Sequence, residues 1–130
     1  MSTPFIVVNE YTIEPGKTDE FLAGFRKIAE TAQANEPDLL YFAEHISEDG
    51  TQGSTVQVHA DAKNMERHME LVGDQIRDIV AYIDFQAIRM YGTPTDAVLQ
   101  QLQALAGDRV TVKPLAMGFD RFGDRVQAVR

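Results

Sequence analysis

The sequence predicts an α+β fold of the ferredoxin-like type, a split β-α-β unit with a four-stranded antiparallel sheet and two helices on one face. The first observation is the order of patterns over residues 5–91, which reads strand, helix, strand and then strand, helix, strand. The second is a polar, glycine-containing connection at residues 48–53, which predicts a hairpin between the two halves. Because crossover connections are right-handed, both helices should cover the same face of the sheet.

The first half contains a strand and a helix. Residues Phe5–Ile13 are rich in Ile, Val, Tyr and Thr, which is typical of a strand, and Pro15-Gly16 supplies the turn that ends it. We expect Thr18 to cap the next helix, which ends before Pro37. The apolar positions of this helix recur at helical spacing: Phe21, Phe25, Ile28 and Ala32.

The second half repeats this order. Leu39–Ser47 and Ser54–His59 read as the two strands of the hairpin, and Asp61 is the expected N-cap of the second helix. A fourth strand is predicted at Phe85–Tyr91. The apolar stripe of the second helix comprises Met65, Met69, Val72, Ile76, Ile79 and Ile83.

The remaining residues, 93–130, are predicted to extend the same domain, whose ferredoxin-like part spans residues 1–92. Thr93-Pro94 is typical of a helix start, and Gly107 marks the end of that third helix. Val110–Phe122 reads as a fifth strand, which its internal proline and glycine confine to an edge of the sheet. We expect this tail to reach over a partner subunit and residues 123–130 to be loose.

Both faces of the predicted sheet carry apolar side chains. In the first strand, one parity holds Phe5, Val7, Tyr11 and Ile13, and the other holds Ile6 and Val8. One chain has helices for one face only, so a second subunit is the economical cover for the other. The sequence thus predicts a homodimer and leaves open which parity faces the helices.

Composition excludes several classes of function. The 130 residues carry a formal net charge of −8, which argues against a nucleic-acid partner because phosphate binding needs clustered Lys and Arg. The chain has no cysteine, which excludes thiol nucleophiles, thiolate metal sites and disulfides. With neither a positively charged leader nor a long apolar run in sight, we expect a cytoplasmic protein with no membrane partner.

Three segments carry a family resemblance. They are VVNEYTIEPGKTDEFL, ANEPDLLYF and VHADAKNMERHM, which fall in the expected order of strand, turn, helix start, connecting segment and second helix. Through them the stretch Phe5–Tyr91 resembles the antibiotic-biosynthesis-monooxygenase-like family, whose members are dimeric α+β barrels. One departure is Asp38, which stands where family members usually have glycine.

The resemblance implies a site between the sheet and the helices. Oxygenases of this family use no flavin or metal and act on electron-rich aromatic substrates, whereas a related branch degrades haem. The haem-degrading branch places an Asn in the first strand, a Trp at the end of the third strand and a His in the second helix. Asn9 and His68 occupy the first and last of these positions, and His59 stands in place of the Trp.

Asn9, His59 and His68 are the candidate catalytic residues. His68 lies about 60° from the centre of its apolar stripe, which predicts a position at the boundary between core and solvent. An imidazole there suits a general base that removes a phenolic proton, or an ordinary hydrogen-bonded histidine. The buried amide of Asn9 needs a partner, either a substrate oxygen or a neighbouring protein group. His59 shares its side of the third strand with Thr55 and Gln57 and is equally compatible with solvent; no metal signature links it to His68.

The candidate substrate-binding residues are Tyr11, Phe25, Met69, Arg89 and Tyr91. Phe25 and Met69 suit an adaptable apolar pocket, although the same spacing is typical of an ordinary core. Arg89 and Tyr91 share one parity of the fourth strand and suit an anionic or phenolic ligand, with an inter-subunit ion pair as the alternative for Arg89. Gly24 in the first helix either opens space for a ligand or allows close packing.

The leading hypothesis is a homodimeric, cofactor-independent monooxygenase that acts on a small aromatic or quinone-like molecule. In this hypothesis, Asn9 holds the developing oxyanion, His68 is the base and His59 orients substrate or water. The alternative is a non-catalytic dimeric module of the same fold that binds a small ligand or serves in assembly. Haem binding or degradation is a third reading, which the missing Trp weakens.

Overall fold

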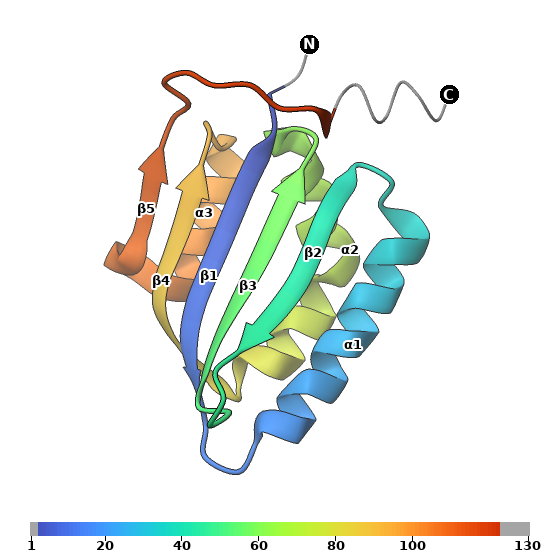
Figure 1. The fold of residues 1–130 in the computed structure, drawn as a ribbon, viewed down its shortest axis with the longest axis vertical. Coiled ribbons are helices and arrows are strands. Elements are labelled where there is room, and N and C mark those ends of the chain that lie inside the picture. The colour runs from blue at the N-terminus through green and yellow to red at the C-terminus, as the bar shows by residue number, and fades with distance from the viewer. Residues whose placement is uncertain (1–2, 123–130) are drawn as a thin grey trace.

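The computed structural model describes residues 3–122 and has the predicted α+β, ferredoxin-like architecture. The tail residues 123–130 lie outside the described residues. The sheet has the order β2-β3-β1-β4-β5 and is open, with β2 and β5 at its edges (Figure 1). Its strands are β1 (Phe5–Ile13), β2 (Leu39–Ile46), β3 (Gln52–His59), β4 (Ile83–Tyr91) and β5 (Val110–Lys113).

Three α-helices lie on one face of this sheet, as Figure 1 shows. Helices α1 (Thr18–Asn35) and α2 (Ala62–Val80) are the two crossovers of the split unit. Helix α3 (Asp96–Ala106) and a single 3₁₀ turn, η1 (Gly107–Arg109), lead into β5, which pairs with β4 in parallel. We call the helix-covered face the inner face and the opposite one the outer face.

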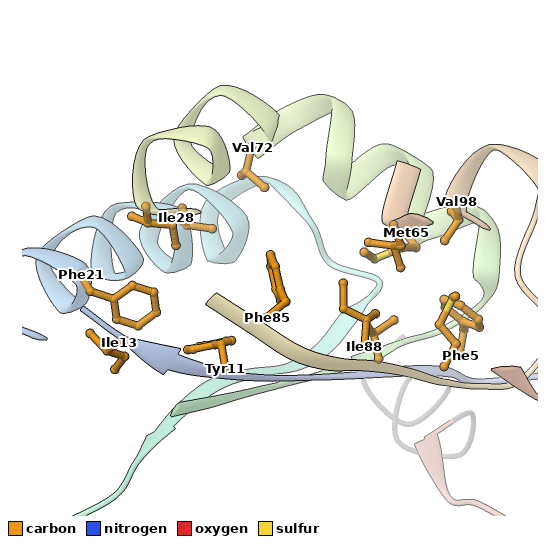
Figure 2. Packing of buried hydrophobic residues seen from close by; sticks show 14 residues of the cluster. Phe5, Tyr11, Ile13, Phe21, Ile28, Met65, Val72, Phe85, Ile88 and Val98 are labelled. Carbon is orange, nitrogen blue, oxygen red and sulfur yellow. The ribbon is translucent and has the colours of Figure 1, made fainter. Parts of the chain in front are cut away.

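The core fills the space between the inner face and the helices. Figure 2 shows Phe5, Tyr11 and Ile88 on strands, facing Phe21 and Met65 on helices. Val98 and Leu102 of α3 are also buried in this cluster. The residues after position 92 therefore contribute to the same core as the first two helices.

Several predicted boundaries need correction. Thr18 does not cap α1; it lies inside the first turn, and its hydroxyl donates to the Gly50 carbonyl in the β2–β3 hairpin. Thr95, rather than Thr93, caps α3 and accepts from the Val98 amide. The predicted fifth strand covers only Val110–Lys113, because the proline that follows cannot donate to the ladder.

Two helix predictions have clear outcomes. Asp61 is the N-cap of α2, and its side chain accepts from the Asn64 amide, as expected. Gly24 serves close packing, because a Cβ at this position would lie 2.2 Å from Ile79 Cγ2 of α2. Its contact is with the neighbouring helix rather than with a ligand space.

Strand β3 does not place its apolar residues on the covered side and its polar residues on the solvent side. Its polar residues Thr55, Gln57 and His59 are all buried, whereas Val56 is only half-buried. Pairing places Thr55 beside Asn9, and Phe42 of β2 lies beside Gln57. The solvated alternative for His59 is therefore wrong, and the sheet has a polar stretch beneath its helices.

Candidate functional site

A small cavity lies between the inner face and the helices. Its volume is about 50 Å³, which gives room for roughly three to five water molecules. Five of the eight predicted site residues line it: Asn9, Tyr11, Phe25, His68 and Met69. Strands β1 to β3 supply most of its polar floor, and the first two helices supply a mainly apolar roof.

His68 of α2 forms a buried pair with Glu36, which follows α1. Its Nδ1–H donates to Glu36 Oε2 at 2.7 Å, and both side chains are only 1% exposed. His68 Nε2 is buried and has no hydrogen-bond partner among residues 3–122. The predicted boundary position is therefore wrong: the segment after α1 and the ring of Phe42 cover this side of α2. A carboxylate that fixes one ring nitrogen leaves the other available as a base.

His59 lies beneath His68, with the two ring centroids 5.6 Å apart. Its Nε2–H donates to Gln57 Oε1, and its Nδ1 accepts from Asn64 Nδ2. Burial, together with the nearby charge of His68, lowers the pKa of His59 from 6.5 to about 3. His59 is thus a neutral imidazole with both nitrogens occupied, and it contacts His68 without lining the cavity.

Asn9 contributes an unused amide to the cavity. Its Oδ1 is buried, and the side chain makes no hydrogen bond within the described part of the chain. Its strand neighbours are Thr55 on one side and Ile88 on the other. A buried acceptor without a protein partner is costly, so Asn9 Oδ1 is suited to a ligand hydroxyl or an ordered water that donates to it.

A second polar group, which we call the Tyr11 cluster, comprises Tyr11, Glu44 and Thr55. The Tyr11 and Thr55 hydroxyls both donate to Glu44 Oε1, and the distance from the Thr55 hydroxyl is 2.8 Å. The two hydroxyl oxygens are 2.7 Å apart. Burial raises the pKa of Glu44, and burial with the Glu44 charge raises that of Tyr11 far above its usual range. Glu44 Oε2 is buried without a partner in residues 3–122.

Room for this cluster depends on Gly53. A Cβ on Gly53 would lie 2.6 Å from Glu44 Oε2 and 2.7 Å from Tyr11 Cε1. Real Cβ atoms do not approach other atoms so closely, so any larger residue would displace the carboxyl group or the ring.

Aromatic side chains close one wall of the cavity. Phe25 of α1 stacks on Phe42 of β2 with a centroid distance of 4.8 Å, and Met69 lies in the same wall. The flexible thioether and the partly buried Phe42 ring make this the adaptable part of the lining.

Arg89 and Tyr91 do not join the other predicted site residues. Both belong to the outer parity of β4, and Arg89 forms an ion pair with Glu10 of the same chain. With Glu10, Arg89 lines a separate outer hollow of about 470 Å³. A direct role for these two residues in the inner cavity is incompatible with their side of the sheet.

Five polar residues of the site are not predicted from the sequence: Glu36, Glu44, Thr55, Gln57 and Asn64. Glu36 had a partial signal, because it stands in the ANEPDLL segment that carries the family resemblance. Thr55 and Gln57 had another, since they share a strand parity with His59. Their burial became visible only in the structure, where the helices cover that side of β3.

Within residues 3–122, no group of three or more His, Cys, Asp or Glu side chains is arranged to hold a metal ion. None of the described helices is both long and apolar enough to cross a bilayer.

The family model for antibiotic biosynthesis monooxygenases matches residues 4–81, well over half of the chain. The chain belongs to the antibiotic biosynthesis monooxygenase family. The match includes Asn9, Glu36, His59 and His68. Comparison with curated protein sequences gives no match.

Solved structures show the same fold in relatives of low sequence identity. MupZ from Pseudomonas fluorescens is 19% identical with a TM-score of 0.73, covering 94% of this chain and 98% of its own. SnoaB, a cofactor-independent oxygenase from Streptomyces nogalater, is 16% identical with a TM-score of 0.60, covering 72% and 96%. A conserved protein from Methanosarcina mazei Go1 is 14% identical with a TM-score of 0.61, covering 68% and 90%. The similarity to MupZ thus extends over nearly the whole chain.

Proposed function

We propose that this member of the antibiotic biosynthesis monooxygenase family is a cofactor-independent monooxygenase acting on a small aromatic or quinone-like molecule. The observation that carries the proposal is the buried Glu36–His68 pair, whose histidine lines the cavity and keeps Nε2 free. The family match and the likeness to SnoaB, itself a cofactor-independent oxygenase, support the same class of reaction.

His68 is the base in this proposal. Its free Nε2 takes a proton from the bound substrate, while Glu36 holds Nδ1–H and stabilises the imidazolium that forms. Asn9 lies on the floor of the cavity, where its amide N–H would donate to the oxyanion of the substrate. His59 acts as a positioning residue, because its neutral ring supports the His68 ring from below.

The substrate supplies the electrons. In an anthrone-type molecule, loss of one proton to His68 gives an electron-rich anion, which passes one electron to dioxygen. The two radicals combine into a peroxide anion, which takes the proton back from His68 and becomes a hydroperoxide. The second methylene C–H bond then breaks, with its proton passing to His68, as the O–O bond breaks, and His68 returns that proton to the departing hydroxide. The methylene carbon becomes a carbonyl, so one oxygen atom enters the product and the other leaves as water.

Substrate binding requires the cavity to widen. An aromatic ring system does not fit into about 50 Å³, so the wall of Phe25, Phe42 and Met69 must move outward. Tyr11, at the opposite side of the floor, is held by Glu44 and Thr55 and stays in place. The apolar wall thus binds the rings, and the polar floor orients their oxygen atoms.

Oxygen uptake with hydroxylated anthrones and quinols tests the proposal. We expect His68→Ala to abolish uptake, Asn9→Ala to reduce it, and His45→Ala, a change at an exposed histidine, to leave it unchanged. Uptake that persists at the normal rate in His68→Ala would overturn the assignment of the base.

A non-catalytic, ligand-binding module is the second candidate, and the partnerless Asn9 Oδ1 and His68 Nε2 in the cavity favour it, because both atoms can bind a ligand without any reaction. Such a module would bind an aromatic ligand without consuming oxygen. Isothermal titration with the same anthrones, run beside the uptake assay, separates the two: binding with no turnover supports the module.

Haem does not fit the site. The cavity of about 50 Å³ is far smaller than a porphyrin, and His59 stands where the haem-degrading branch has Trp. We expect no Soret shift when the protein is titrated with haem.

We also propose a homodimer that pairs through the outer face. Val8 of β1 and Val56 of β3 are paired at the centre of this face, and both are only half-buried. Leu115, Met117 and Phe119 are strongly exposed in the segment after β5, which crosses the top of the sheet in Figure 1 and would reach over the partner. A role of Arg89 and Tyr91 in substrate binding would then require a site formed with the second subunit.

Analytical ultracentrifugation tests the dimer. Val8→Glu places a charge at the centre of the outer face and should give monomers, whereas Lys63→Glu, at an exposed position on α2, should leave the dimer intact. A wild-type monomer at micromolar concentration would contradict the pairing.

We propose, finally, that residues 1–92 and the extension 93–130 form one folding domain. The pairing of β5 with β4 and the burial of Val98 and Leu102 support this. A chain cut after position 92 should therefore fail to show a cooperative unfolding transition.

A further inference from the structure

Gln57 of β3 lines the cavity, and the proposed oxygenase reaction leaves it without a role. Its side chain is buried on the inner face, between Thr55 and His59 along the strand. Its partners on the neighbouring strands are apolar, Val7 of β1 and Phe42 of β2. An amide has two N–H donors and an oxygen acceptor, and burial of either end without a partner is costly. A glutamine in this position therefore needs partners that the adjacent strands do not supply.

A chain of hydrogen bonds fixes the orientation of this amide. Asn64 Nδ2 donates to His59 Nδ1 over 2.8 Å, so the hydrogen of the neutral His59 ring is on Nε2. That hydrogen is donated to Gln57 Oε1 over 3.0 Å. Burial lowers the pKa of His59 to about 3 and thereby keeps the ring neutral. The oxygen end of the Gln57 amide is therefore committed to His59.

The nitrogen end of the Gln57 amide faces the cavity. Oxygen and nitrogen are the two arms of one planar group, so Nε2 points away from His59 when Oε1 points toward it. Gln57 lines the cavity and His59 does not, which puts Nε2 on the cavity side. Nε2 makes no hydrogen bond to any group among residues 3–122. Both of its N–H bonds are therefore available to an acceptor atom inside the cavity.

The surroundings of Nε2 select the kind of ligand atom. Two N–H donors bind an oxygen with free lone pairs, such as that of a ketone, a quinone or a phenolate. The wall of Phe25, Phe42 and Met69 suits the ring that carries this oxygen. A ligand N–H in the same place would bring a donor against a donor, so amines are disfavoured.

We propose that Gln57 is a substrate-binding residue: its Nε2–H donates to a carbonyl or phenolate oxygen of an aromatic ligand, and His59 holds the amide in this direction. The inference rests on the proposed function, because it places the ligand in the same cavity. It adds an oxygen-binding donor separate from Asn9, which pairs with Thr55, one inner-face row or about 7 Å along the strand from Gln57.

Paired ligands test this donor without any turnover. Naphthalene and para-naphthoquinone have the same ring system, and only the quinone has acceptor oxygens. The chain has no cysteine, so the quinone finds no thiol to alkylate. Isothermal titration of the full-length protein under nitrogen gives both dissociation constants. We expect the wild type to prefer the quinone, and Gln57→Met to reduce this preference roughly five- to tenfold through loss of one hydrogen bond. Gln52→Met, at an exposed glutamine of the same strand, is the matched control and should keep the preference.

The orienting role of His59 has its own variant. His59→Phe keeps a ring at this position but removes the N–H that holds Gln57 Oε1, so the amide can turn and the quinone preference should fall. A ratio of two affinities cancels any general loss of folded protein, which a merely structural role would cause. An unchanged ratio in His59→Phe would show that His59 does not orient the amide.

NMR of the isotope-labelled wild type makes the test independent of how stable Gln57→Met is. The Gln57 side-chain amide protons should move downfield on titration with the quinone and less with naphthalene, because a hydrogen bond deshields the donated proton. Amide signals that respond equally to both ligands contradict the proposal.

The outcomes separate this inference from the oxygenase. An unchanged quinone preference in Gln57→Met with a normal circular dichroism spectrum overturns the inference, whatever the oxygen uptake. A wild type that binds both ligands equally, or neither, overturns it as well. Loss of the preference in a protein that consumes no oxygen supports the inference and overturns the monooxygenase.

Discussion

Acidification should destabilise the protein through His59. This side chain is 0% exposed, and as a neutral ring it both donates to Gln57 and accepts from Asn64. Protonation would place a second N–H against the Asn64 amide, which also donates. Burial and the charge of His68 accordingly lower the pKa of His59 to about 3, from the 6.5 expected in the unfolded chain.

The magnitude follows from linkage. A lowered histidine pKa means that the unfolded state binds more protons than the folded state. The contribution of His59 to the free energy of unfolding is therefore complete above pH 6.5 and is lost as the pH falls toward 3. At pH 5, a histidine with the ordinary pKa is almost fully protonated in the unfolded chain and neutral in the fold. The free energy of unfolding should therefore fall by about 2 kcal/mol between pH 8 and pH 5 from this residue alone.

Urea denaturation at both pH values measures this loss. The wild type is compared with His59→Gln, which removes the titrating group, and with His45→Gln, which changes an exposed histidine. We expect His59→Gln to be less stable at pH 8 but to lose about 2 kcal/mol less than the wild type on acidification. Parallel losses in the wild type and His59→Gln would refute the reasoning.

Three further predictions concern packing and charge. Gly53→Ala should lower the free energy of unfolding by about 1–3 kcal/mol in urea titrations, because its Cβ would collide with the Glu44 carboxyl and the Tyr11 ring; an unchanged midpoint would contradict this. Gly24→Ala should cost a similar 1–3 kcal/mol despite better helix propensity, since Ile79 occupies the space; thermal unfolding would reveal a stabilised variant if this is wrong. Glu44→Gln should be more stable than the wild type at neutral pH, because the raised pKa of Glu44 makes its ionisation destabilising. This gain in stability should vanish below pH 4.5, and a gain that is constant with pH argues for another cause.

Much of the fold could be predicted from local pattern. The limits of β1, Phe5–Ile13, follow from its composition and the turn after it, and Asp61 caps α2 as expected. The prediction that Thr18 caps α1 was wrong because its hydroxyl donates to the Gly50 carbonyl, 32 residues away in sequence. Caps are predictable where the partner is three residues away and unpredictable where a hairpin competes for the hydroxyl.

The candidate site was predictable only in part. Asn9 and His68 were identified through position on their elements and family resemblance, and both line the cavity. Glu36 was not identified, because it lies 32 residues from His68 and nothing in the local sequence shows that its carboxylate turns into the core. Arg89 was grouped with the pocket by residue type, whereas strand parity places it on the outer face.

By itself, the sequence determined the succession of strands and helices, since periodicity and turn residues act over a few positions of the chain. Tertiary structure alone decided which side of β3 is covered, and hence that Thr55, Gln57 and His59 are buried polar groups. It also brought Glu36 to His68 and Glu44 to Tyr11. The physical reason is that burial and hydrogen-bond partners come from elements distant in the chain, and these contacts set the protonation and reactivity of the site.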